Sequence, residues 1–172
     1  MALQGEPVAH NDLVAGSDTT LHSHAGGGGG FTPTYFQSVK SGDTGASTSW
    51  TNIPSWSTPS HTHADYSFNT STGILTINTV GDYELVGSVL VQGGSSRVQS
   101  GVRGMLNGGA IAGCEYRNYS SRNTTQVLGS VNISGFLVTC SATDTLNLQC
   151  IYVGSSSTIS AAGTWFQVRK IG

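Results

Sequence analysis

Short stretches that alternate apolar and polar residues recur from residue 34 to the C-terminus, and they limit the fold more than any other feature. Residues 83–92, 98–106 and 146–153 place apolar or small side chains at every second position, which is the period of a β-strand. Turn residues separate these stretches, and Asn107-Gly108 is a dipeptide favoured in type I′ hairpins. No window shows helical apolar spacing. The pattern predicts an all-β fold.

The number and spacing of these stretches indicate the architecture. About ten short strands separated by turns are typical of a two-sheet antiparallel jelly-roll sandwich. The residues 126–140 form a long apolar stretch interrupted at Ser134-Gly135, and the C-terminal residues 164–170 form an aromatic strand. The other strands are predicted at residues 34–39, 49–53, 66–68, 74–77 and 110–116.

Composition excludes several classes of function. Only 9% of the 172 residues are charged, whereas 37% are hydrophobic, which favours an ordered β protein over a disordered chain. The net charge is −2 and no Lys/Arg cluster exists, so we expect no nucleic-acid partner. No apolar run approaches the roughly 20 residues of a membrane span, and the N-terminus lacks the features of a signal peptide. We expect no membrane insertion and synthesis in a cytoplasm.

The chain divides into an arm and a head. Residues 1–30 contain few large apolar side chains, too few to bury a core, and they end in the five-glycine run 26–30, which predicts a flexible joint. Residues 31–172 carry the strand pattern. We therefore predict an extended N-terminal arm that binds an assembly or other copies of the chain, followed by one jelly-roll head.

The head resembles the C1q/TNF-like jelly-roll family over residues 64–172. The features that carry the resemblance occur in the family's order: a Gly-containing turn at 71–74, the Gly-Asp-Tyr start of a long strand at 81–83, a hairpin at 106–108, a buried strand at 142–148 and an aromatic strand at 163–168. The chain departs from the family at Thr143, where a Gly is expected, and in its high Ser/Thr content.

The family resemblance implies a homotrimer. Proteins of this family expose an apolar sheet face that only neighbouring chains cover. The strand 146–153 and the C-terminal aromatic pair supply the apolar residues that we predict at the trimer axis: Leu146, Leu148, Trp165 and Phe166.

The arm is similar to short polar segments of bacteriophage tail and fibre proteins. Such segments form intertwined trimers, so the resemblance implies a virion location and docking on a capsid or tail protein. The predicted docking residues are His10, Asn11, Asp12 and Leu13. His22-Ser23-His24 places two imidazoles on one face of an extended chain. Three arms would supply six nitrogens, an octahedral set that suits a divalent first-row metal, iron first. An exposed pair without metal is the alternative.

A second histidine motif raises the question of an enzyme. His61, His63 and Asp65 resemble part of the iron site of jelly-roll oxygenases, but that site needs a third ligand. No histidine follows His63, and no Gly-x-Ser-x-Gly motif or P-loop occurs. We predict no catalytic residues, and we interpret the motif as a loop face or a minor contact.

The segment 116–123 is the predicted recognition surface. Its side chains combine large amphipathic contacts with adaptable hydrogen bonding, and we assign receptor or partner contact to Tyr116, Arg117, Asn118, Tyr119 and Arg122. A polar trimer interface is an equal alternative. Trp50 and Trp56 either pack against the sandwich or stack on a sugar.

The sequence thus favours a trimeric bacteriophage structural protein. One form of this hypothesis is a fibre or tail-tip protein whose head binds a host surface receptor, often a glycan. The other is a head fibre or decoration protein. A secreted C1q-like carbohydrate-binding protein and an iron oxygenase are the alternatives from other classes. The three cysteines, Cys114, Cys140 and Cys150, are predicted to be buried strand residues.

Overall fold

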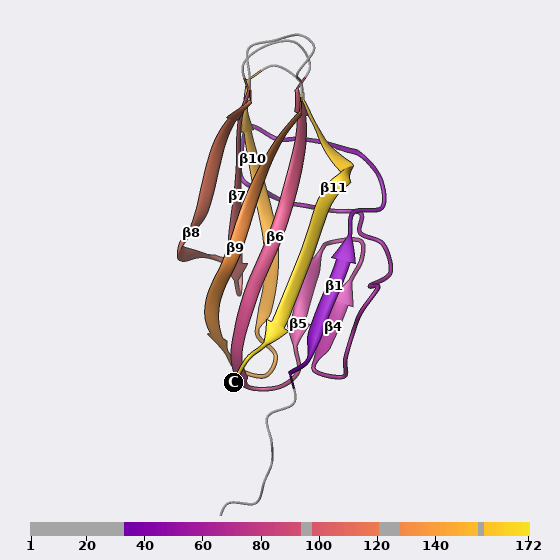
Figure 1. Ribbon diagram of the computed structural model, residues 1–172, viewed down its shortest axis with the longest axis vertical. Coiled ribbons are helices and arrows are strands. Elements are labelled where there is room, and N and C mark those ends of the chain that lie inside the picture. The colour runs from indigo at the N-terminus through magenta and orange to yellow at the C-terminus, as the bar shows by residue number, and fades with distance from the viewer. Residues whose placement is uncertain (1–32, 94–97, 121–127, 155–156) are drawn as a thin grey trace, which may run out of the picture. The chain divides into compact units, whose positions relative to one another are not determined.

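The structure is a computed structural model that describes residues 33–93, 98–120, 128–154 and 157–172 (Figure 1). The described residues belong to one unit, Thr32–Gly172. All of their regular elements are β-strands, arranged in two antiparallel sheets. The all-β two-sheet prediction is therefore confirmed.

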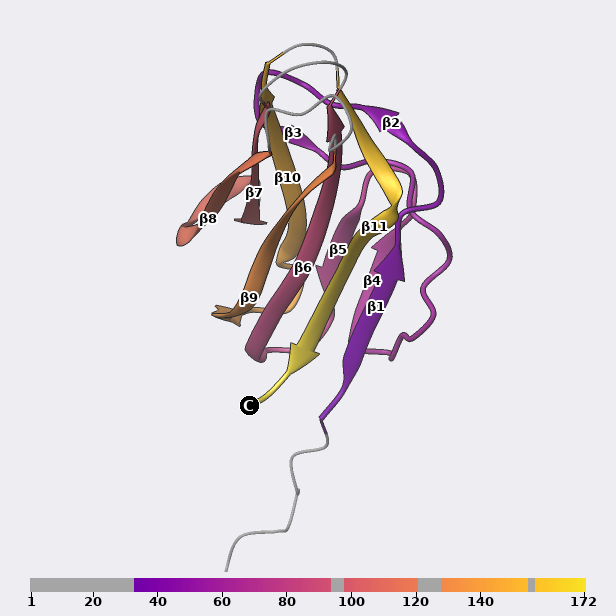
Figure 2. The same cartoon turned by 45° about the horizontal axis from the view of Figure 1, so that its top comes forward.

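The first sheet has the strand order β1-β11-β6-β9, and β2 pairs with β11. The second has the order β4-β5-β10-β7-β8, and β3 pairs with β10. Figure 2 shows the two sheets lying one over the other, with the short β2 and β3 at the end of the sandwich. The strand bounds are β1 Tyr35–Val39, β2 Thr44–Gly45, β3 Thr51–Asn52, β4 Tyr66–Asn69, β5 Ile74–Ile77, β6 Gly81–Gly93, β7 Val98–Leu106, β8 Gly109–Ser120, β9 Leu128–Cys140, β10 Thr145–Val153 and β11 Ser157–Lys170.

The core lies between the sheets because alternate residues of each long strand point inward. In β6 the inward side chains include Tyr83, Leu85, Val89 and Val91, all at most 1% exposed. A cluster of aromatic rings occupies one part of the core, where the Phe36 ring lies 4.6 Å from Phe68 and 5.5 Å from Phe166 between centroids. Contacts at these distances add to the free energy gained by removing the rings from water.

The hairpin predicted at Asn107-Gly108 is confirmed. Asn107 has φ 50° and Gly108 φ 77°, the two positive values that a type I′ turn requires. Asn107 also connects to the neighbouring turn, because its Nδ2 donates to Asp144 Oδ1 at 2.8 Å and its Oδ1 accepts from the Thr145 amide at 2.8 Å. The side chain of Asn107 thus fixes two turns at one end of the second sheet.

Two long strands, β9 and β11, differ from the prediction. The interruption expected at Ser134-Gly135 is an irregularity within one continuous strand, β9, where Gly135 takes φ 70° opposite a register shift between Leu85 and Gly87 of β6. A bulge lets the strand continue while the extra residue is accommodated. Likewise, the C-terminal strand predicted at 164–170 begins at Ser157, with an irregularity between Ser160 and Trp165.

Candidate functional site

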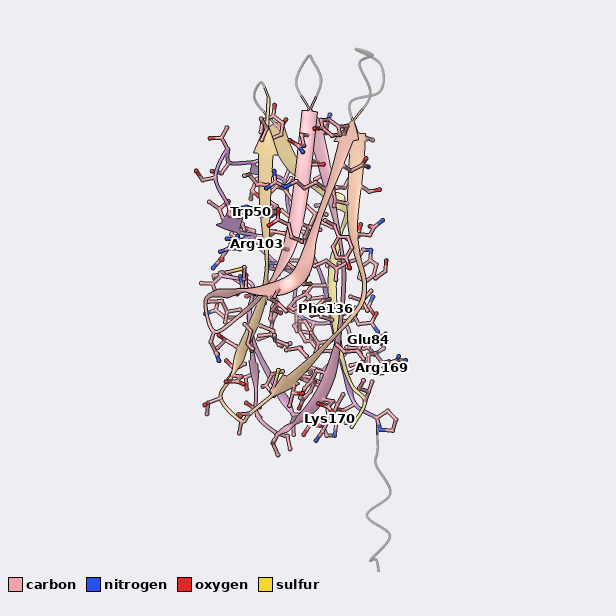
Figure 3. All side chains as sticks on the ribbon, turned by 90° about the vertical axis from the view of Figure 1, so that its left-hand side faces the viewer. Trp50, Glu84, Arg103, Phe136, Arg169 and Lys170 are labelled. Carbon is pink, nitrogen blue, oxygen red and sulfur yellow. The ribbon has the colours of Figure 1, made fainter. Side chains whose placement is uncertain are left out.

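Trp50 lies on the outer face of the second sheet, between two arginines. The Arg103 guanidinium carbon is 4.5 Å and that of Arg117 is 5.6 Å from the centre of the indole ring. The indole packs over Gly101 of β7, where an added Cβ would come within 3.0 Å of Trp50 Cη2. A larger residue at position 101 would therefore push the indole or the Ile151 side chain out of place. Figure 3 shows Trp50 and Arg103 side by side, away from Arg169 and Lys170.

Arg103 is held by a chain of amide side chains on neighbouring strands. Its Nε and Nη2 donate to Gln149 Oε1 at 3.0 and 2.7 Å. Gln149 Nε2 donates to Asn52 Oδ1 at 2.9 Å, and Asn147 Nδ2 donates to the same oxygen at 2.9 Å. The antiparallel register places Arg103 opposite Gln149 and Gln149 opposite Asn52. The sheet thus orients the guanidinium before any ligand arrives.

Arg117 differs from Arg103 in its ion pairing. Arg117 Nε donates to Glu115 Oε1 at 2.8 Å, and both side chains are about two-fifths exposed. By contrast, no carboxylate within the described ranges forms an ion pair with Arg103. Glu115 is also the cross-strand neighbour of Arg103 in the β7–β8 register, so two arginines share one carboxylate and one positive charge remains in excess. We call the group formed by Trp50, Asn52, Arg103, Glu115, Arg117 and Gln149 the tryptophan–arginine patch.

The predicted recognition residues divide between two faces of β8. Arg117 belongs to the patch, and Tyr119, two positions further on the same strand face, is 73% exposed. Tyr116 and Asn118 have the opposite parity, and Asn118 Nδ2 donates to Ser130 O of β9 at 3.0 Å, so they lie toward the edge between the sheets. Arg122 lies outside the described residues. The segment is an edge strand, which is one of the placements expected for it.

Sequence reasoning missed Asn52, Arg103 and Gln149. These residues come from three strands, and the residues of one contact lie 97 positions apart in the chain. Nothing in their local sequence indicates a shared site. For Trp50 the sequence left two alternatives, packing against the sandwich or stacking on a sugar, and the structure brings it to Arg117 of the predicted recognition segment.

The outer face of the first sheet carries a second surface. Cross-strand neighbours place Val39 of β1 beside Trp165 of β11, and Trp165 lies opposite Ser88 of β6. Val39 is 44% exposed and Leu137 of β9 is 61% exposed. Apolar side chains thus remain in contact with solvent on this face. We call this surface the first-sheet face.

The structure corrects the predicted trimer axis. Leu146 and Phe166 are fully buried and Leu148 is 1% exposed inside a single sandwich, so these side chains offer nothing to a neighbouring chain. Successive strand residues point to opposite faces, and Phe166 therefore enters the core while the adjacent Trp165 lies, half-buried, on the first-sheet face. Of the four predicted residues, only Trp165 is placed where another chain could contact it.

The histidine motif at residues 61–65 forms hydrogen bonds within the chain. The Tyr35 hydroxyl contacts His61 Nδ1 at 3.0 Å, and His63 Nδ1 lies 3.3 Å from Asp65 Oδ2. Asp65 accepts from Thr79 and, at 2.7 Å, from Thr34. The Thr79 hydrogen bond is the main reason that the pKa of Asp65 lies below its ordinary value. Both carboxylate oxygens of Asp65 therefore already accept hydroxyl donors.

The three cysteine thiols are not activated. The three cysteines are buried and unpaired, and burial raises the pKa of Cys140 to about 11 and that of Cys150 to about 12. Thiols with such values are protonated at neutral pH and are poor nucleophiles. Within the described ranges, no group of three His, Cys, Asp or Glu side chains could hold a metal ion.

Two sets of predicted residues lie outside the described part of the chain. They are the docking residues His10, Asn11, Asp12 and Leu13 and the metal ligands His22 and His24. In the part of the chain that is described, no helix is long and apolar enough to cross a membrane.

Comparisons with known proteins place the fold. No protein-family model matches the sequence, and no curated protein is similar to it. Among solved structures, murine APRIL at pH 8.5 has a TM-score of 0.57 at 14% identity, covering 81% of this chain and 100% of that chain. Eiger TNF from S. frugiperda has a TM-score of 0.59 at 13% identity, covering 83% and 94%. The chain therefore has a TNF-like jelly-roll fold.

Proposed function

We propose that this chain is a bacteriophage virion structural protein, a trimer whose arm docks on the particle and whose head binds a host surface receptor. The observation that carries the proposal is the union of two parts: a TNF-like jelly roll with a solvent-exposed apolar face, and a polar arm that ends in five glycines. An arm with too few apolar residues to fold alone gains order by binding a partner.

The first-sheet face supports the trimer. Val39 and Trp165 form an apolar centre there, and the ion pair between Arg169 Nη2 and Glu84 Oε2 at 2.6 Å lies on the same face. An apolar centre with a charged rim is typical of protein interfaces. Closed threefold symmetry would bury one such surface against a different surface of the next chain.

A matched pair of valines tests the trimer. Val39 lies on the first-sheet face, whereas Val80, 65% exposed, lies in the turn before β6. The Val39→Glu variant should dissociate the trimer, and the Val80→Glu variant should leave it intact. Light scattering at micromolar concentration reads the mass directly. A wild-type chain that is a stable monomer contradicts the proposal, and so does a Val39→Glu variant that stays trimeric.

The division between arm and head is tested on particles. A chain that lacks residues 1–25 should keep its fold and its trimeric mass but should no longer join the particle. Immuno-electron microscopy of purified phage, with antibodies against the head, gives the location on capsid or tail. A truncated head that still incorporates would place docking in the sandwich instead of the arm.

We also propose that His22 and His24 of three arms share one divalent metal, iron first. Six imidazoles around one axis would repel when protonated, so binding should weaken as the pH falls through about 6.5, the ordinary pKa of histidine. Elemental analysis should find about one metal per three chains. The double variant His22→Ala/His24→Ala should remove it, and a trimer without metal contradicts the site.

The proposed role is binding without turnover. Asp65, the one carboxylate of the oxygenase-like motif, is occupied by hydroxyl donors from Thr34 and Thr79. Purified protein with Fe²⁺ should not consume 2-oxoglutarate, and consumption that the His63→Ala variant abolishes would reverse the assignment.

A secreted C1q-like carbohydrate-binding protein is the second candidate. The fold itself favours it as much as a virion protein, because the similar solved structures are murine APRIL and an insect TNF. Detection of the protein in purified particles, and its absence from culture fluid free of phage, distinguishes the two.

A further inference from the structure

The tryptophan–arginine patch presents a positive charge that the protein does not neutralise. Arg103 donates to Gln149 Oε1, which is a neutral acceptor, and no described carboxylate pairs with it. The indole of Trp50 and the amide of Gln149 together hold the guanidinium in one place. A fixed guanidinium with free N–H groups matches the planar fork of a carboxylate.

The hydrogen-bond pattern around Arg103 favours the same kind of ligand. Gln149 Oε1 accepts twice from Arg103, and Asn52 Oδ1 accepts from both Gln149 and Asn147. Gln149 Oε1 and Asn52 Oδ1 are therefore in use as acceptors. The groups of this network that remain for a ligand are donors, namely the other N–H groups of Arg103 and the Asn52 amide nitrogen. The neighbouring acceptor, Glu115, is paired with Arg117. Such a surface binds acceptor-rich, anionic groups.

Apolar and aromatic area lies beside the charged group. Trp50 is half-buried and packs over the Gly101 backbone next to Ile151. Tyr119, 73% exposed, follows Arg117 by two positions on the same face of β8, which is about 7 Å along a strand. Because Arg117 contacts the Trp50 ring, Tyr119 lies about one strand step beyond that contact on the same face, and each aromatic ring offers a flat surface to the C–H face of a pyranose.

From this arrangement we infer that the tryptophan–arginine patch binds an acidic saccharide, with the sugar carboxylate on Arg103 and the sugar rings against Trp50 and Tyr119. The inference rests on the proposed receptor-binding function of the head and names the class of receptor. A small inorganic anion would use the charge of Arg103 but would not need the aromatic side chains.

Binding to the full-length chain is measured by isothermal titration calorimetry with matched probes. The carboxylated probes are a tetragalacturonate and 3′-sialyllactose, and the neutral counterparts are the fully methyl-esterified tetragalacturonate and lactose. Inorganic phosphate is the third kind of probe. At least one carboxylated probe should bind one site per chain, more weakly as salt rises, and its neutral counterpart should bind at least tenfold more weakly.

Two variants separate a binding role from a structural one. Arg103→Gln should weaken binding by roughly tenfold to a hundredfold, the effect of losing hydrogen bonds to a charged group. Gln149→Glu puts a carboxylate where Arg103 already donates, so it keeps the arginine in place and neutralises it. Gln149→Glu also gives up the hydrogen bond from Gln149 Nε2 to Asn52 Oδ1, so circular dichroism is used to verify that the variant is folded. The folded variant should lose binding to a similar degree.

Lys170→Gln is the matched control, because it also removes one positive charge but lies on β11 of the other sheet, far from Trp50 in Figure 3. It should bind like the wild type. The inference is wrong if neither carboxylated probe binds, if the neutral counterparts or phosphate bind equally well, or if Gln149→Glu retains the wild-type affinity.

The outcome is independent of the trimer. All the patch residues belong to one chain, so light scattering on the same samples separates the two proposals. A monomer that binds the acidic saccharide would reject the trimeric virion protein and keep the patch. A trimer on particles that binds neither carboxylated probe would reject the saccharide site and keep the trimeric virion protein.

Discussion

The adjacent residues Trp165 and Phe166 test which side of β11 stabilises the sandwich. The Phe166 ring is fully buried, 5.5 Å from Phe36 and 6.1 Å from Trp56 between centroids. Replacing a buried Phe by Ala costs about 3–5 kcal/mol, because transfer free energy is lost and a cavity remains. Total stability of a domain is about 5–15 kcal/mol, so Phe166→Ala removes a large share of it.

Urea unfolding followed by far-UV circular dichroism measures this loss. With a slope of about 2 kcal/mol/M, the Phe166→Ala midpoint should fall by about 1.5–2.5 M. Phe166→Leu, which keeps most of the volume, should cost less and remain measurable if the alanine variant is unfolded. Trp165→Ala should destabilise a single sandwich less than Phe166→Ala does, because Trp165 is only partly buried, and should in addition reduce the trimer fraction.

Protein concentration separates the two effects. Assembly stabilises the folded chain by mass action, so the wild-type midpoint should rise with concentration, and Trp165→Ala should weaken that dependence. Phe166→Ala should lower the midpoint at every concentration. Equal losses for both variants at high dilution would refute the assignment of the two side chains to opposite faces, and so would a Phe166→Ala cost below about 1 kcal/mol.

Three further predictions follow from local contacts. The pKa of Asp65 lies below its ordinary value of 3.8 in the folded chain, so the ionised carboxylate stabilises the fold above pH 3.8, and this contribution is lost as the pH falls through the folded-state pKa. Asp65→Asn should therefore cost about 1 kcal/mol at pH 7. The difference in urea midpoint between the variant and the wild type should vanish in acid. Gly108→Ala should cost roughly 1 kcal/mol in thermal unfolding, because Gly108 has φ 77° while nothing lies within 4 Å of the added Cβ; an unchanged Tm would contradict the backbone argument. Cys114, Cys140 and Cys150 should resist Ellman's reagent at pH 8 until the chain is denatured, since all are buried with raised pKa values; rapid labelling of the native protein would show that the strands open.

The sequence determined the local structure of this protein. Alternation along residues 83–92 and 98–106 predicted β6 and β7, and Asn107-Gly108 predicted the turn that follows β7. These features depend on neighbours in the chain, because side-chain parity and positive φ are properties of a few consecutive residues. The same reasoning predicted the buried cysteines, which the structure confirms.

Only the tertiary structure decided which side of each strand meets the core. Leu146, Leu148 and Phe166 are as apolar as interface residues, and the resemblance to the C1q/TNF-like family led us to predict them at the trimer axis. In the folded chain they fill the space between the two sheets. A period of two identifies two faces of a strand, but the neighbouring sheet determines which face is covered.

The candidate site likewise depends on strand pairing in the folded chain and not on local sequence pattern. Arg103, Gln149 and Asn52 meet because β7, β10 and β3 are neighbours in one sheet with one register. Backbone hydrogen bonds between distant segments set that register, and no local pattern encodes it. The sequence therefore determined the strands and turns, whereas the charge of the patch and its fixed geometry arose only when the sheet assembled.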